Sequence, residues 1–68
     1  MKYTVIFEKT STGYSAYAPD LPGCITTGKT KQETERNMQE AMHGHLELMR
    51  EEGLPIPEPT TTAKLIPA

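Results

Sequence analysis

The chain has 68 residues, of which one is cysteine, one is phenylalanine and none is tryptophan. A single cysteine excludes a disulfide within the chain, and a free thiol is typical of a reducing compartment. No apolar run approaches the ~20 residues that span a bilayer, and no signal-peptide pattern precedes the first charged residues. We therefore expect a cytoplasmic, soluble protein with no membrane segment.

An excess of basic residues is also missing, since seven Lys and Arg stand against nine Asp and Glu, for a net charge of −2. Nucleic-acid binders normally carry a basic stripe that neutralises phosphates, so no direct nucleic acid binding is expected. So short a chain buries only about 60% of its unfolded surface, which leaves a marginal core that a partner chain commonly supplements. We expect one domain, residues 1–68, in a homo-oligomer.

Three segments have the composition of β-strands. Residues 1–7 alternate, with Tyr3, Val5 and Phe7 on one face, and the polar residues 9–13 suit a hairpin loop. Residues 14–18 predict a second strand that ends before Pro19, and the short β-branched segment 24–27 predicts a third. These strands predict an antiparallel sheet.

Between the second and third strands lies a turn motif made up of Pro19, Asp20, Leu21, Pro22, Gly23 and Cys24. Proline presets φ at the second position of a type II turn and glycine accepts a positive φ at the third. We expect Asp20 to accept backbone N–H bonds within this turn.

Thr30 and Glu33 form a capping box that predicts a helix start, and Gly53 is a typical residue just after a helix end. At 100° per residue, one stripe of this helix is predicted to pack on the sheet. Its members are Thr34, Met38, Ala41, Met42, His45 and Met49.

The prolines that follow Gly53 require an extended chain, and residues 60–67 have β-like content that predicts a fourth strand with Ala63, Leu65 and Ile66 buried. The predicted order is β-β-β-α-β, an α+β fold with one helix on an antiparallel sheet.

A sheet covered by a helix on one face needs only one apolar face, yet Ile6, Tyr17 and Ile25 point to the other. A second apolar face indicates a partner or oligomer interface. The alternative is that these are isolated surface hydrophobic residues, which are common.

The polar residues predict no catalytic, metal or cofactor site. Cys24 lacks an assured base, and His43 and His45 point about 200° apart on a helix, so they cannot share an ion. Asp20 lacks the second acid, base or metal that hydrolysis requires.

The motif from Pro19 to Cys24, followed by Thr27, Gly28, Thr30 and Glu33 and by the proline-rich segment 53–59, resembles the HicB-like antitoxin family. This resemblance covers nearly the whole chain. It implies a partial ribonuclease H-like fold without nuclease activity, and a small basic RNA-cleaving toxin (HicA-like) as the partner. Many such proteins carry a C-terminal DNA-binding module, for which the residues after Pro59 are too few.

Three hypotheses follow. The first is an antitoxin that binds the toxin and occludes its active face, with acidic helix residues such as Glu40 and Glu47 matching a basic surface. The second is an orphan homo-oligomeric domain that binds a ligand or acts as a regulator without a toxin. The third, a minimal hydrolase, has the least support, because no acid/base pair is apparent.

Overall fold

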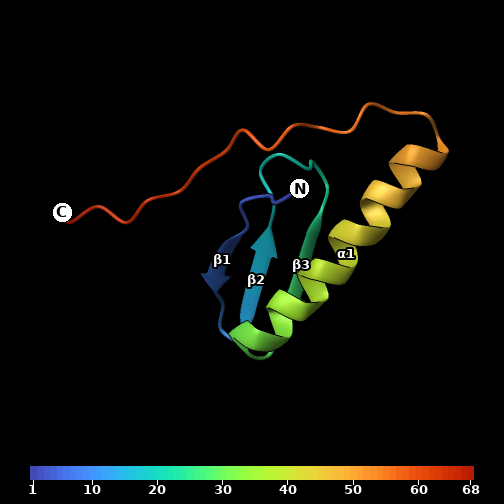
Figure 1. Ribbon diagram of the computed structural model, residues 1–68. Coiled ribbons are helices and arrows are strands. Elements are labelled where there is room, and N and C mark those ends of the chain that lie inside the picture. Colours follow the sequence, from blue (N-terminus) through green and yellow to red (C-terminus); the bar gives the residue numbers. More distant parts are fainter.

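The computed structural model describes residues 1–68, which form three strands followed by one long helix (Figure 1). The strands are β1 (Ile6–Lys9), β2 (Tyr14–Tyr17) and β3 (Ile25–Gly28), and the helix is α1 (Lys31–Glu51). The sheet has the order β1-β2-β3, and both strand pairs are antiparallel. The architecture is therefore α+β, which confirms the predicted class.

The hairpin between β1 and β2 closes where the Thr10 N–H donates to the Gly13 carbonyl oxygen at 2.8 Å. The ladder begins at Ile6, later than predicted, because the residues before it have no partner on β2. The predicted alternation still holds in this segment, since Tyr3, Val5 and Phe7 all pack against the core.

Local signals account for both ends of α1. At the start, Thr30 Oγ1 accepts the Glu33 N–H at 3.0 Å, which satisfies one of the free N–H groups of the first turn. At the end, Gly53 has a φ of 70°, its N–H donates to the Arg50 carbonyl at 3.1 Å, and the Leu54 N–H donates to the Met49 carbonyl at 2.9 Å. These two bonds form a Schellman motif, for which glycine is the preferred residue.

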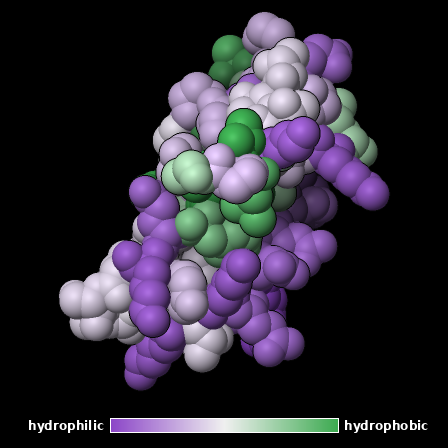
Figure 2. Space-filling model, turned by 90° about the vertical axis from the view of Figure 1, so that its left-hand side faces the viewer, coloured by the Kyte–Doolittle hydropathy of each residue, from purple (hydrophilic) through white to green (hydrophobic).

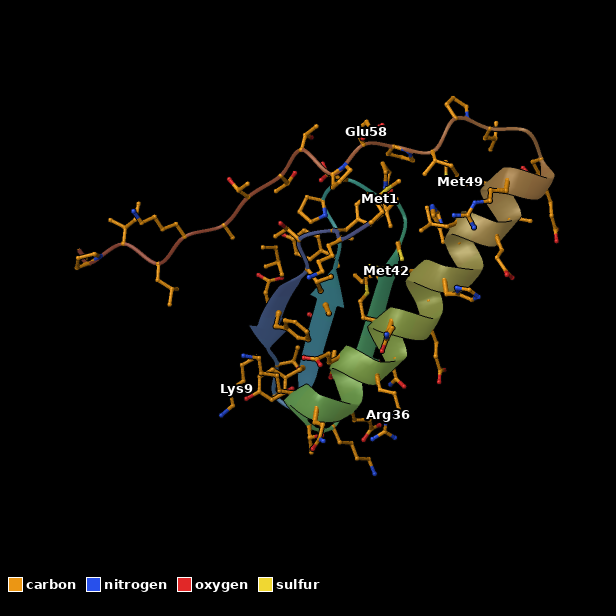
Figure 3. The ribbon with its side chains drawn as sticks, in the orientation of Figure 1. Met1, Lys9, Arg36, Met42, Met49 and Glu58 are labelled. Carbon is orange, nitrogen blue, oxygen red and sulfur yellow. The ribbon has the colours of Figure 1, made fainter.

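The core lies between α1 and the sheet, chiefly over β3 and β2. Its buried apolar residues are Ala16, Ala18, Leu21, Cys24 and Met38, with Thr34 buried beside them. Met42 lies on the side of α1 that faces the sheet, whereas Met49 lies near the helix end, beyond the sheet (Figure 3). Since α1 covers β1 only partly, an open groove of about 410 Å³ remains between them, lined in part by Val5, Phe7 and Met42.

The predicted fourth strand is wrong, because the chain after α1 contains no strand. It crosses one end of the sheet and then leaves the body of the molecule (Figure 1). Side chains of the first segment hold it there: the Tyr3 hydroxyl donates to the Pro57 carbonyl at 2.5 Å, and the Thr4 hydroxyl donates to the Thr61 carbonyl at 2.5 Å. Beyond these anchors every residue is exposed, so the prediction that Ala63, Leu65 and Ile66 are buried is wrong.

Candidate partner-binding surface

The motif between β2 and β3 forms two successive tight turns. The Leu21 N–H donates to the Ala18 carbonyl and the Cys24 N–H to the Leu21 carbonyl, each at 3.0 Å. Gly23 has a φ of 83°, as the third position of a type II turn requires. Leu21 is fully buried and anchors the turn in the core, while Pro19 and Pro22 stay exposed at its surface.

The outer face of the sheet, opposite α1, carries a row of three apolar side chains. Ile6 faces Tyr17 in the β1–β2 pair, and Tyr17 faces Ile25 in the β2–β3 pair, so the three lie side by side across all strands. Tyr17 is 38% exposed and Ile25 is 64% exposed, whereas Ile6 is half-buried. We name Ile6, Tyr17 and Ile25 the outer row. They form a continuous apolar strip on the surface.

The outer row and the turn adjoin one another. An open groove of about 390 Å³ is lined by Tyr17 and Ile25 from the sheet and by Pro19 and Pro22 from the turn. The lining is mostly apolar, with aromatic, aliphatic and proline side chains and no charged group. Such a concave apolar surface can receive a side chain of another protein.

Asp20 fastens the turn to the chain after α1. Its Oδ2 accepts the N–H groups of Thr60 at 3.0 Å and Thr61 at 2.9 Å, while its Oδ1 accepts the hydroxyls of Thr60 at 3.1 Å and Thr61 at 2.8 Å. The Thr61 N–H, followed by the Thr61 hydroxyl and the two Thr60 donors, lowers the pKa of Asp20 below its ordinary 3.8.

The expectation that Asp20 would accept N–H bonds within its own turn is therefore wrong, since its partners are forty residues further along the chain. Sequence reasoning missed Thr60 and Thr61 as part of this region. The sequence does hold a signal for this contact, since the two consecutive threonines after Pro59 offer four hydrogen-bond donors to a single carboxylate.

No hydrogen bond joins Cys24 to His43 or His45, the groups considered for catalysis. Burial raises the pKa of the Cys24 thiol, which favours the neutral form and disfavours a nucleophile. His43 Nε2 lies 3.3 Å from Glu47 Oε1, and both side chains are exposed on α1. No three His, Cys, Asp or Glu side chains are placed to share a metal ion. The helix α1 lacks the long apolar stretch that a membrane-spanning helix requires.

A family model described as the HicB_like antitoxin of bacterial toxin-antitoxin system matches residues 3–68. The chain belongs to the HicB-like antitoxin family. The match covers every element of the structure, from the strip before β1 to the exposed end of the chain, and so includes the turn, the outer row and the Asp20 contacts. The resemblance that the turn motif and helix cap suggested is confirmed.

Relatives of the HicB-like chain differ in length. A UPF0150 protein of Thermoplasma acidophilum is 45% identical over 58 residues, which cover 84% of each protein. Antitoxin HicB 2 of Photorhabdus laumondii is 34% identical over 61 residues, which cover 90% of this chain and 44% of the antitoxin. This chain therefore spans less than half of that relative.

A chain of a solved HicA3 and HicB3 toxin-antitoxin complex has a similar structure. The TM-score is 0.75 at 35% sequence identity, and the match covers 88% of this chain and 70% of the other. The three-stranded sheet with one long helix is thus a fold shared with a toxin-antitoxin protein.

Proposed function

We propose that this HicB-like protein binds a small HicA-like toxin and neutralises it by occluding the face with which the toxin cleaves RNA. The observation that carries this proposal is the outer row, an exposed apolar strip continuous with the groove at the turn. Family membership supports the antitoxin role, and the similar chain from a HicA3 and HicB3 complex supports the nature of the partner.

We assign the proposed contact with the toxin to the outer face of the sheet. Tyr17 supplies a large, rigid side chain with a polar tip, which is the kind of residue that dominates binding energy in protein interfaces. The groove beside it offers a recess for a side chain of the toxin. Pro19 and Pro22 form the far wall of this recess and are held in place by the buried Leu21.

The acidic residues on α1 have a different role. Glu40 and Glu47 are exposed on the helix, which covers the opposite face of the sheet from the outer row. One small toxin therefore does not contact both surfaces. The carboxylates of Glu40 and Glu47 instead contribute to a negative electrostatic potential, which attracts a basic partner and raises the rate of association.

The fold is proposed to be a partial ribonuclease H-like fold without nuclease activity. A two-metal nuclease needs several convergent carboxylates. Both oxygens of Asp20 are taken up by Thr60 and Thr61, and Glu8 lies on the outer strand β1. The protein acts by binding, in the cytoplasm, where an RNA-cleaving partner has its substrate.

The test compares two substitutions of exposed apolar residues. Ile25→Asp places a charge in the outer row, whereas Leu48→Asp makes the same kind of change on α1, where Leu48 is 54% exposed. We expect Ile25→Asp to raise the Kd for the toxin at least about tenfold, as the loss of an interface hot spot does. Leu48→Asp should bind and inhibit like the unsubstituted protein.

Two readouts separate the possible failures. Inhibition of RNA cleavage by the purified toxin tests the antitoxin function, and calorimetric titration of each variant tests the surface. If the unsubstituted protein fails to inhibit the toxin, the function is wrong. If it inhibits and Ile25→Asp inhibits equally well, the function stands and the outer row is the wrong surface. Circular dichroism checks that both variants are folded.

A further inference from the structure

Two parts of the molecule have the geometry of β-structure but no partner. The first is the outer edge of β1, which pairs with β2 on one side only. The second is the C-terminal segment 62–68, which is extended, exposed at every residue and makes no backbone hydrogen bond. Seen from the side where β1 and the C-terminal end lie, apolar surface gathers in the middle of the molecule and hydrophilic residues surround it (Figure 2). Unpaired edges and extended apolar segments are the elements that proteins join by strand addition.

The side chains of the two elements match in one antiparallel register. Residues that face each other in an antiparallel pair point to the same side of the sheet. In this register the facing pairs are Ile66 with Ile6, Leu65 with Phe7, Lys64 with Glu8, and Ala63 with Lys9. Two of the four pairs are apolar and a third joins opposite charges, so three pairs are complementary, while the small Ala63 leaves room for the Lys9 side chain.

The two faces of the sheet also match. Ile66 would lie beside Ile6 and extend the outer row by one residue across the sheet. Leu65 would lie on the other face beside Phe7, at the open groove of about 410 Å³ that α1 leaves uncovered. Leu65 is 98% exposed and Ile66 77% exposed, so this pairing removes the two most exposed large apolar side chains near the C-terminal end from water.

The tail of the same chain cannot reach this register. Thr61 is held next to Thr4, two residues before β1 begins, by the bond between the Thr4 hydroxyl and the Thr61 carbonyl. Ala63 follows two residues later and reaches at most about 7 Å from Thr61. Lys9, which Ala63 must face, is about 16 Å along the strand from Thr4. A tail that enters from the Lys9 end of β1 has to come from another molecule.

We propose that residues 63–66 of one copy add as an antiparallel strand to β1 of a second copy, and that the exchange is reciprocal. Each copy supplies one tail and one strand edge, which gives a closed two-fold dimer. The proposal concerns the protein alone and stands independently of the proposed function. Edge pairing leaves Tyr17, Ile25 and the turn free for a different partner.

The first experiment measures the mass of the 68-residue protein in solution by light scattering and the dimer Kd by analytical ultracentrifugation. We expect a dimer. Lys64→Glu and Glu8→Lys should each raise the dimer Kd on the order of tenfold, since each puts two like-charge pairs into the dimer. The double variant should restore the Kd of the unsubstituted protein. Lys29→Glu makes the same charge change between β3 and α1, outside the paired strands, and is the control.

The second experiment tests the register by cross-linking, in a Cys24→Ala background that removes the native thiol. Facing residues of antiparallel strands are close enough for a disulfide. A mixture of Ile6→Cys and Ile66→Cys proteins should therefore form a covalent heterodimer on mild oxidation. A protein that is monomeric in the first experiment overturns the proposal. A dimer whose Kd is unchanged by both charge substitutions and that yields no cross-link overturns it as well. A tail that becomes ordered only when a toxin is added overturns it too.

Discussion

At the scale of single residues, β3 and α1 approach each other closely where Gly28 faces Thr34. A Cβ added at Gly28 would lie 2.5 Å from Thr34 Oγ1 and 2.8 Å from the Thr34 backbone nitrogen. Thr34 is fully buried, and its hydroxyl is held by the Thr30 carbonyl at 2.7 Å, so it cannot move aside. We expect Gly28→Ala to lower the free energy of unfolding by about 1–3 kcal/mol, as overpacking does. Urea denaturation measures the change.

Gly44 provides the matched control, because the same added methyl group would meet nothing within 4 Å. It lies within α1, where glycine is less stable than alanine by about 0.5–1 kcal/mol. Gly44→Ala should therefore raise the denaturation midpoint while Gly28→Ala lowers it. Equal shifts in the same direction would show that the approach of β3 to α1 does not limit the packing.

The residues that sequence reasoning placed well are those whose role is set by near neighbours. Thr30 and Gly53 bound α1 because a cap depends on backbone groups within a few residues, and Gly23 takes the positive φ that its turn demands. The alternation of side chains along each strand placed Ile6, Tyr17 and Ile25 on one face of the sheet. Only the strand register shows that the three are adjacent. Whether they bind a partner stays a prediction.

At the scale of elements, the Asp20 carboxylate joins the turn to the segment after α1. Because the pKa of Asp20 is lowered in the folded protein, the stabilisation by its bonds to Thr60 and Thr61 is fully present above pH 3.8 and is lost as the pH falls through the lower folded value. We expect Asp20→Asn, which keeps one acceptor oxygen and no charge, to release this segment at neutral pH. An NMR titration of the Thr60 and Thr61 amide signals measures both effects.

Glu58→Gln is the control for this prediction, since it removes the same charge from a nearby exposed position that makes no such bond. Its Thr60 and Thr61 amide signals should match those of the unsubstituted protein at neutral pH. If the signals of Asp20→Asn also remain unchanged, the bonds from Thr4 and Tyr3 suffice to hold the segment and the carboxylate is dispensable.

The same contacts explain why the fourth strand was wrongly predicted. The β-like content of residues 60–67 is a local property, whereas a strand also needs a neighbour with free hydrogen-bonding groups in reach. Asp20 and Thr4, both remote in sequence, hold the segment across the end of the sheet rather than along β1. Composition alone does not reveal such an anchor, and residues 62–68 leave the body with their β-forming side chains unpaired.

At the scale of the whole molecule, the core is too small to explain the fold by itself. Only 6 of 68 residues are buried, and Leu21 and Met38 are the largest apolar side chains that are fully enclosed. Domains of this size usually gain stability from disulfides, metals or association, and the single cysteine excludes the first within one chain. Four of the exposed large apolar residues lie at the outer row and at the C-terminal end, namely Tyr17, Ile25, Leu65 and Ile66, so association has surfaces on which to act.

Association through the tail links stability to protein concentration, because mass action favours the dimer over two unfolded chains. We expect the Tm to rise by roughly 5 °C for each tenfold increase in protein concentration, given the unfolding enthalpy typical of a dimer of this size. Differential scanning calorimetry over a concentration series measures this slope. Leu65→Asp should abolish the slope, because it places a charge beside Phe7 in the exchanged strand, whereas Leu48→Asp should leave it unchanged. A Tm that does not vary with concentration in the unsubstituted protein would mean that this small core is stable within a single chain, and the exposed Leu65 and Ile66 would then need a different partner.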